Sequence, residues 1–145
     1  CICSQNQILN YQKRLSGPLL DRIDLTVSVS RVPHEKLLNN KMSTKSQQET
    51  FLSEIHKAYS IQRGRYKCSY KYNNDISSNR VDKITSISES AKTFLTNAAR
   101  KLDLSTRSYF KVIKVSRTIA DLEGSTSIEI THIAESLQYR QINIG

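Results

Sequence analysis

Two neighbouring stretches with the spacing of amphipathic helices, residues 86–102 and 106–122, limit what this chain can fold into. Only Asp103, Leu104 and Ser105 separate them, so the second helix is expected to turn back against the first. The face positions are Ile87, Ala91, Phe94, Leu95, Ala98 and Leu102 in the first stretch, and Tyr109, Val112, Ile113, Ser116, Ile119 and Ala120 in the second. Because each face must be covered, the pattern predicts a small bundle of short antiparallel helices.

Candidate cap residues predict where the helices of this bundle begin and end. Ser86 with Glu89 is a capping-box pair for the first helix, and Gly124 is a C-terminal stop for the second. Thr131 is the expected N-cap of a last helix, whose apolar residues are Ile133, Ala134 and Leu137. The bundle should therefore close with this third helix.

The first 33 residues are expected to hold a short helix and a strand. Ser4 with Gln7 is a capping-box pair, and the helical spacing of the apolar residues that follow predicts a helix over residues 5–14. Residues 25–30 alternate between apolar and polar side chains, which predicts a half-buried strand ending before Pro33.

A polar linker and a longer helix are expected in the middle of the chain. Residues 39–46 are polar, and Thr44 with Gln47 begins a helix over residues 45–63. Gly64 is the expected stop of this helix, and the stretch that follows up to residue 80 has no clear period. The apolar residues of the helix are Phe51, Leu52, Ile55, Ala58 and Tyr59.

Together these elements predict a mainly α chain in three parts. A helix-strand segment occupies residues 1–33, and a linker with a connecting helix occupies residues 34–80. The small C-terminal helical bundle occupies residues 81–145.

The composition excludes some classes of protein and leaves the partner open. Hydrophobic residues make up 37% of the chain, which supports a packed core, and no apolar run approaches the roughly 20 residues that span a bilayer. Since the N-terminus does not resemble a signal peptide, we expect a cytoplasmic protein without a membrane partner. The net charge of +9 points to a polyanion such as nucleic acid, or to an acidic remainder of a longer protein. The start at Cys1 favours the longer protein.

The sequence lacks the motifs that bind and hydrolyse ATP. It contains no G-x-x-x-x-G-K-[ST] loop, and its four glycines are widely spaced. No acidic pair follows an apolar stretch as a Mg²⁺-binding motif would, and the three histidines lie far apart. We therefore expect no enzyme activity and no bound cofactor for this chain alone.

Arg22 is the first candidate for a functional side chain. It lies on a short turn directly before the predicted strand, which would fix its place and aim its guanidinium outward at an anion. The alternative is an ion pair of Arg22 with Asp21 or Asp24. The residues alone leave both interpretations open.

The chain resembles a known family in three motifs. RLSGPLLDRIDL, which begins at Arg14, resembles the segment after the sensor-1 strand in magnesium-chelatase-like AAA+ ATPases of the ComM/YifB family. SRTIADLEGS and ITHIAESLQYR, which begin at Ser116 and Ile130, are similar to the closing motifs of that family. The resemblance implies that residues 1–33 are the edge of a AAA+ core and residues 81–145 its helical lid.

The same resemblance implies roles for individual arginines. Arg22 matches the arginine finger, which enters the ATP site of the neighbouring subunit and stabilises charge on the γ-phosphoryl group. Arg107 matches the sensor-2 arginine, which contacts the nucleotide of its own subunit. Because Arg107 shares the polar face of its helix with Lys111, a solvated basic stripe is the alternative. Arg117 lies at the edge of the apolar face, where a structural bond to Asp121 or a carbonyl is favoured over a nucleotide role.

For the full-length protein, the resemblance implies ATP and Mg²⁺ as cofactors, a hexameric ring, and a motor that acts on DNA in branch migration. DNA as the substrate follows from the resemblance alone, and a protein or chelatase-type partner stays open. Cys1 and Cys3 resemble half of a four-thiolate zinc site whose other half would lie upstream, so no metal is expected in this chain.

A basic, tyrosine-rich stretch supports a second class of function. Arg65, Lys67 and Lys71 alternate with tyrosines, a mixture that stacks bases and tracks phosphates. Packing of the tyrosines against the bundle is the alternative. The competing interpretation of the whole chain is a stand-alone basic helical domain that binds nucleic acid or another protein.

Overall fold

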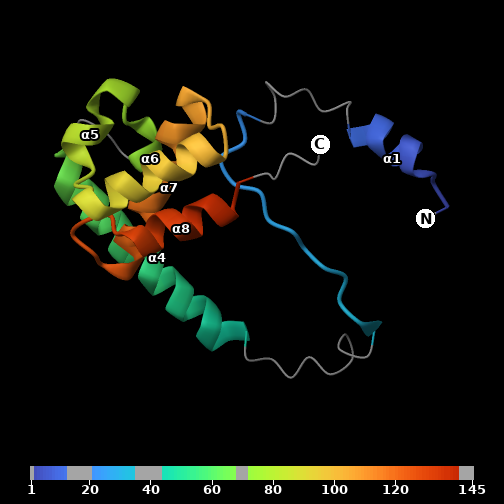
Figure 1. Cartoon of the computed structure of the whole chain (residues 1–145). Coiled ribbons are helices and arrows are strands. Elements are labelled where there is room, and N and C mark those ends of the chain that lie inside the picture. Colours follow the sequence, from blue (N-terminus) through green and yellow to red (C-terminus); the bar gives the residue numbers. More distant parts are fainter. Residues whose placement is uncertain (1, 13–20, 35–43, 68–71, 141–145) are drawn as a thin grey trace.

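The computed structural model describes residues 2–12, 21–34, 44–67 and 72–140, and these are mainly α-helical (Figure 1). The predicted mainly α class is therefore confirmed. In chain order the elements are α1 (Gln5–Gln12), α4 (Thr44–Tyr66), the 3₁₀ turns η1 (Asn73–Asp75) and η2 (Ser78–Arg80), α5 (Val81–Ile84), α6 (Glu89–Lys101), α7 (Thr106–Glu123) and α8 (Ile130–Gln138).

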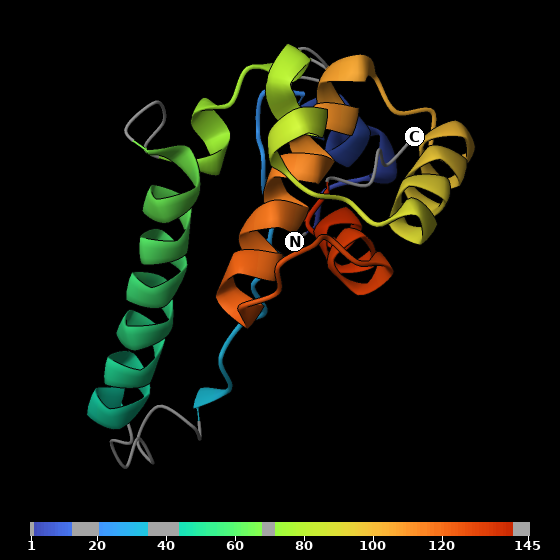
Figure 2. The ribbon, with the colours of Figure 1, turned by 90° about the vertical axis from the view of Figure 1, so that its left-hand side faces the viewer.

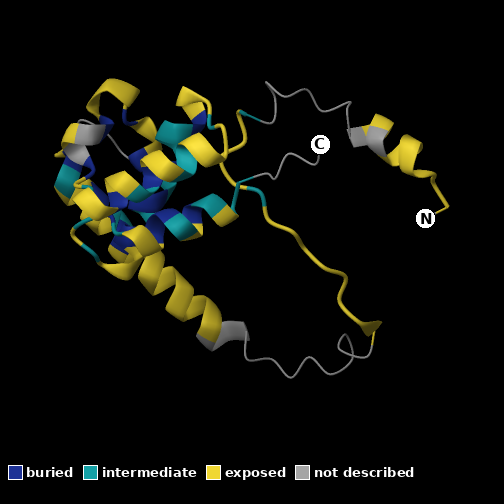
Figure 3. Cartoon of the chain, viewed as in Figure 1, coloured by how far each residue is buried: buried dark blue, intermediate teal, exposed yellow. Residues whose placement is uncertain are grey.

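Helix α7 is the centre of the bundle. It packs against α8, α4, η1 and α5, while α6 packs against α8 (Figures 1 and 2). The buried apolar core is formed by Tyr66, Ile76, Val81, Ala91, Leu95, Val112, Ile113, Ile128 and Ile133. Figure 3 shows buried residues gathered where α7 and α8 pack together, whereas the coloured residues of α1 and of the N-terminal half of α4 are exposed.

The predicted ends of two helices are confirmed by their caps. Ser105 caps α7 by accepting a hydrogen bond from the Ser108 backbone N–H, and Gly124 ends the helix with a φ of 80° that favours glycine. At α1, the Ser4 N–H donates to Gln7 Oε1 at 2.8 Å, which is one half of the predicted capping box. The predicted last two residues of this helix lie outside the described residues.

Two predicted N-caps in the bundle are wrong, each for a long-range reason. Helix α6 begins with Ser88 as its cap because Ile87 forms a parallel bridge with Ile128, which holds the residues around Ser86 out of the helix. Helix α8 is capped by Glu129 instead of Thr131. The backbone N–H of Glu129 donates to Nδ1 of His132, which fixes this earlier start.

The predicted stop at Gly64 is also wrong, since α4 continues to Tyr66. Arg65 bonds Asp121 of α7 and Tyr66 bonds Asn73, so tertiary partners stabilise the extra turn. The predicted linker over residues 39–46 falls largely outside the described residues.

The predicted strand over residues 25–30 is not formed. This segment runs extended, with one backbone bond from the Thr26 N–H to the Tyr139 carbonyl at 2.7 Å. A strand requires a neighbouring strand to complete its ladder, and no described residue supplies one. The apolar side chains that define the alternation, Leu25, Val27 and Val29, are all exposed.

Among the described helices, none is both long and apolar enough to cross a membrane.

Candidate functional site

The turn that carries Arg22 is bound to the start of α7. The Asp21 carboxylate accepts a hydrogen bond from the Ser108 hydroxyl at 2.7 Å and one from the Ser105 hydroxyl at 3.2 Å. The backbone carbonyl of Asp21 accepts a third bond, from Lys111 Nζ, at 2.9 Å. The first two turns of α7 therefore hold this turn by its residue 21.

Both carboxylates that flank Arg22 are used by α7. Lys111 also forms an ion pair with Asp24, with 2.7 Å between Nζ and Oδ1. Arg22 is exposed and forms no ion pair with either aspartate, or with any other described residue. The alternative in which Arg22 pairs with Asp21 or Asp24 is therefore not formed.

The Asp21 carboxyl is surrounded by groups that favour its charged form. The hydrogen bond from Ser108 lowers the pKa of the Asp21 carboxyl below its usual range, against a smaller opposing effect of partial burial. Ser105, Lys111 and Arg107 contribute in the same direction as Ser108. Arg107 lies in the first turn of α7, the end of the helix to which Ser105 and Ser108 bind Asp21, so Arg107 and the Arg22 turn lie at the same end of α7. Arg107 itself is exposed.

The lysines that share the polar face of Arg107 are not simply solvated. Lys111 is held by Asp21 and Asp24, and Lys114 donates to the Asn74 carbonyl at 2.8 Å. This face is therefore not a fully solvated basic stripe, because its lysines form polar contacts with residues 21, 24 and 74.

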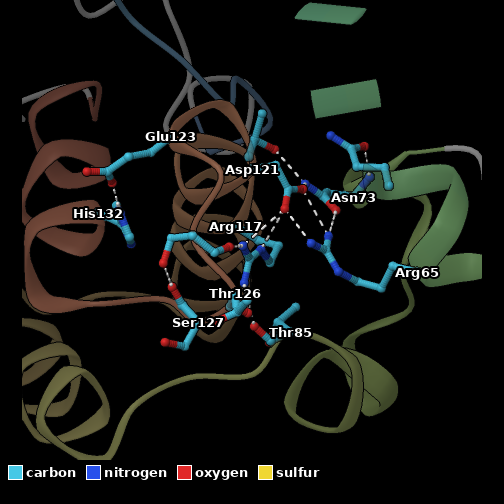
Figure 4. A network of polar contacts seen from close by, with 12 residues as sticks. Arg65, Asn73, Thr85, Arg117, Asp121, Glu123, Thr126, Ser127 and His132 are labelled. Atoms are coloured by element: carbon cyan, nitrogen blue, oxygen red, sulfur yellow. Dashed lines mark hydrogen bonds and ion pairs between the residues drawn. The ribbon is translucent and has the colours of Figure 1, made fainter. Parts of the chain in front are cut away.

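Arg117 is fully buried and hydrogen-bonded on all sides (Figure 4). Its Nε donates to Asp121 Oδ1 at 3.0 Å, and its Nη atoms donate to the backbone carbonyls of Thr85, Ser125 and Thr126. Burial lowers the pKa of Arg117, and the charge of Asp121 opposes that effect. The favoured structural interpretation of Arg117 agrees with these contacts, and its nucleotide role stays a prediction.

Arg65 points inward to the same carboxylate (Figure 4). Its Nη1 donates to Asp121 Oδ2 at 2.9 Å, and Nη2 bonds the other carboxylate oxygen. Asn73 completes this network, because its Nδ2 donates to Asp121 Oδ2 at 3.0 Å and to Thr118 Oγ1 at 2.9 Å. Lys67 is exposed and Lys71 lies outside the described residues, so the nucleic-acid role of this stretch stays a prediction.

Asp21, Ser108 and Asn73 have contacts that the sequence did not reveal. The sequence indicates Asp21 as a possible partner of Arg22 and gives no sign of its bonds to α7. Ser108 lies three residues after the cap residue Ser105, on the same side of the helix, and this spacing is the signal that was available. Asn73 follows an aperiodic stretch, where no local pattern indicates a partner.

A pocket of about 370 Å³ lies next to the Arg22 turn, between the extended segment and α7 and α8. Its apolar lining comes from Leu25, Val27, Val115, Ile119 and Leu122, and its polar lining includes Lys111 and Lys114. The segment after the turn therefore does not close tightly over the bundle.

Metal ligands do not gather in the parts of the chain that the structure describes. No three His, Cys, Asp or Glu side chains in those ranges are placed to hold an ion. Cys3 is exposed, and Cys1 lies outside the described residues, so the half-site prediction is not tested.

Comparisons with known proteins identify related sequences over most of the chain. Residues 44–140 match the family model of the magnesium chelatase subunit ChlI C-terminal region, and residues 1–37 match that of magnesium chelatase subunit ChlI. The chain is 37% identical over 137 residues to the competence protein ComM of Haemophilus influenzae, which covers 94% of this chain and 26% of that protein.

Further relatives show the same partial coverage. The uncharacterized protein YifB of Salmonella typhimurium is 31% identical over 141 residues, covering 97% of this chain and 27% of its own length. The uncharacterized protein Rv2897c of Mycobacterium tuberculosis is 30% identical over 141 residues, with 97% and 28% covered. The chain thus spans about a quarter of the length of these relatives.

Proposed function

This chain belongs to the magnesium chelatase subunit ChlI C-terminal family, and from that premise we propose that it supplies two arginines to the ATP sites of a AAA+ ring that acts on DNA. The observation that supports this most is the exposed Arg22, whose two neighbouring carboxylates are both bonded to α7. An arginine without an ion pair, on a held turn, can bind an incoming anion.

In this proposal Arg22 acts on the ATP of the neighbouring subunit. Its guanidinium stabilises the charge that spreads over the γ-phosphoryl oxygens during transfer to water. Arg107, at the N-terminal turn of α7, contacts the phosphates of its own subunit, where the helix N-terminus also favours an anion. ATP and Mg²⁺ are bound by the rest of the full-length protein, which works in the cytoplasm as a hexamer.

DNA is the proposed substrate of the motor. The relative from Haemophilus influenzae is named a competence protein, and the net charge of +9 suits a polyanion. The same charge favours the second candidate, a basic domain that binds nucleic acid without ATP. The two differ in whether DNA changes the rate of ATP hydrolysis.

Mixed rings of the full-length protein test the trans role of Arg22. Subunits with Arg22→Ala keep their own phosphate loop, and subunits with a disabled phosphate loop keep Arg22. If Arg22 acts in trans, two inactive preparations regain ATPase activity when mixed, because some interfaces then combine an intact loop with an intact arginine. Mixtures that stay as inactive as their components contradict the trans role.

The same experiment with Arg107→Ala tests the cis role. A subunit with Arg107→Ala then has a defective ATP site whatever its neighbour, so mixing restores nothing. Recovery of activity in this second mixture would show that Arg107 serves the neighbouring site. Adding DNA to wild-type rings tests the substrate, since an unchanged ATPase rate over a range of salt concentrations contradicts a DNA motor.

A further inference from the structure

Residues 21–24 are held to the bundle by a set of polar contacts at one place. Ser105, Ser108 and Lys111 follow one another at intervals of three residues, so they lie along one side of the first turns of α7. Ser105 and Ser108 donate to the Asp21 carboxylate at 3.2 and 2.7 Å, and Lys111 donates to the Asp21 backbone carbonyl at 2.9 Å. Hydrogen bonds to an ionised carboxylate are roughly twice as strong as neutral ones.

Apolar packing contributes little to holding this segment. Ile23 and Leu25 are 48% and 52% exposed, and the pocket of about 370 Å³ lies beneath Leu25 and Val27. The next contact along the segment is the single backbone bond from Thr26 to Tyr139. The position of Arg22 therefore depends on the contacts of its neighbours, Asp21 and Asp24.

The residues that hold the turn also belong to the start of α7. Ser105 is the N-cap of the helix, since its Oγ accepts from the Ser108 N–H at 3.1 Å while the same hydroxyl donates to Asp21. Arg107 lies between Ser105 and Ser108 in this first turn. A change in the position of this helix end is therefore passed directly to the turn.

We propose that Asp21 is a positioning residue that clamps the Arg22 turn to the first turn of α7, so that Arg22 and Arg107 are held as one unit. The clamp is a property of this chain, and its consequence for ATP hydrolysis rests on the proposed function. The two serine hydroxyls bind the Asp21 carboxylate, and Lys111 adds its bonds to the Asp21 carbonyl and to Asp24.

A distance measurement tests the clamp without ATP. Spin labels are attached at Ile23→Cys and Lys101→Cys, both exposed, in a chain whose Cys1, Cys3 and Cys68 are replaced by serine. We expect a narrow distance distribution with Asp21 present, a broad one with Asp21→Ala or Ser108→Ala, and an intermediate one with Asp21→Asn, which keeps one acceptor.

Ser136→Ala is the matched control for Ser108→Ala. It also removes a buried serine hydroxyl, one that bonds Ser116 and the Ile133 carbonyl away from Asp21. This control should keep the narrow distribution. The clamp is refuted if Asp21→Ala and Ser108→Ala both keep the narrow distribution, or if Ser136→Ala broadens it as much as they do.

Kinetics of the full-length protein test the positioning role. We expect Ser108→Ala to lower kcat about 10- to 100-fold with little change in KM for ATP, because misplacing a group that acts in the transition state costs on that scale. In an Arg22→Ala background, Ser108→Ala should cost less than about twofold, since the residue that it positions is already gone.

The outcomes separate the clamp from the proposed function. A loss from Ser108→Ala that is equally large with and without Arg22 contradicts positioning through Arg22. If Arg22→Ala leaves the ATPase rate unchanged, the proposed function fails, while the label distances still decide whether Asp21 forms the clamp.

Discussion

At the scale of single residues, Asp121 is the buried counter-charge of two arginines, so its loss should destabilise the fold. Its carboxylate is fully buried and shared by Arg65 and Arg117, which come from different helices. Arg117 in turn binds the carbonyls of residues 85, 125 and 126, so one carboxylate organises three connections around α7. Both residues of this motif, Arg117 and Asp121, therefore have structural partners inside the bundle.

Replacing Asp121 tests this account of the motif. Asp121→Ala leaves the fully buried Arg117 guanidinium without its counter-charge, so the free energy of unfolding should fall by about 3–5 kcal/mol. Urea denaturation of the two chains measures the difference. Asp103→Asn is the control, since this exposed residue has a positive φ of 47° that asparagine tolerates, and it should change stability by less than about 0.5 kcal/mol. Equal stability of Asp121→Ala and the wild type would contradict a structural role.

The pKa of Asp21 gives the clamp a defined dependence on pH. The hydrogen bond from Ser108 lowers this pKa in the folded chain, so the stabilisation is complete above the pKa of the unfolded chain and is lost as the pH falls through the lower folded value. The distance between labels at residues 23 and 101 should therefore be narrow at neutral pH and broaden on acidification below the ordinary aspartate range.

Carboxyl NMR titration of Asp21 provides the matching measurement. Ser108→Ala removes the largest cause of the lowered pKa, so Asp21 should titrate at a higher pH in this variant than in the wild type. In the Ser136→Ala variant, the Asp21 carboxyl should titrate at the same pH as in the wild type. If the Asp21 carboxyl titrates at the same pH in all three proteins, the Ser108 hydroxyl does not lower its pKa.

At the scale of elements, α4 is packed over one half of its length only. Ala58, Gln62 and Tyr66 of the C-terminal half are buried, whereas Phe51 and Ile55 of the N-terminal half are 60% and 55% exposed. The predicted apolar face of this helix is therefore real, but the bundle covers only part of it.

Two isoleucines compare the packed core with the exposed half of α4. Ile113→Ala should lower the free energy of unfolding by about 2–5 kcal/mol, because Ile113 is 1% exposed and the change leaves a cavity in the core. Ile55→Ala should change it by less than about 0.5 kcal/mol. Comparable losses in thermal or urea unfolding would show that the N-terminal half of α4 is covered in solution.

Local pattern predicted the elements of the bundle better than their ends. The periodic runs predicted α6 and α7, and Gly124 ends α7 as the sequence indicated, because this cap acts within a few residues of sequence. The predicted cap at Ser86 and the predicted stop at Gly64 are wrong because contacts with residues far away in sequence, Ile128 and Asp121, decide where α6 begins and α4 ends. The strand predicted over residues 25–30 is wrong for the same reason, because an alternating pattern forms a strand only where a neighbouring strand completes its hydrogen bonds.

At the scale of the whole molecule, the sequence indicated three arginines as candidates, but it did not predict what surrounds each of them. The resemblance named Arg22, Arg107 and Arg117, and the contacts then divide them into two exposed arginines at one end of α7 and one that is buried in the bundle. The division depends on Asp21 and Asp121, whose partners lie far away in sequence, so no local motif could have given it.

The Arg22 turn and Arg107 lie at one end of α7, and we propose that both arginines serve ATP hydrolysis in the full-length protein. The direct test is the DNA-stimulated ATPase rate of the full-length protein with Arg22→Ala, beside the exposed Arg31→Ala as a matched control. We expect Arg22→Ala to lower kcat by about a thousandfold, the scale of an arginine finger, and Arg31→Ala to keep the wild-type rate. An Arg22→Ala protein that hydrolyses ATP at the wild-type rate would contradict the account.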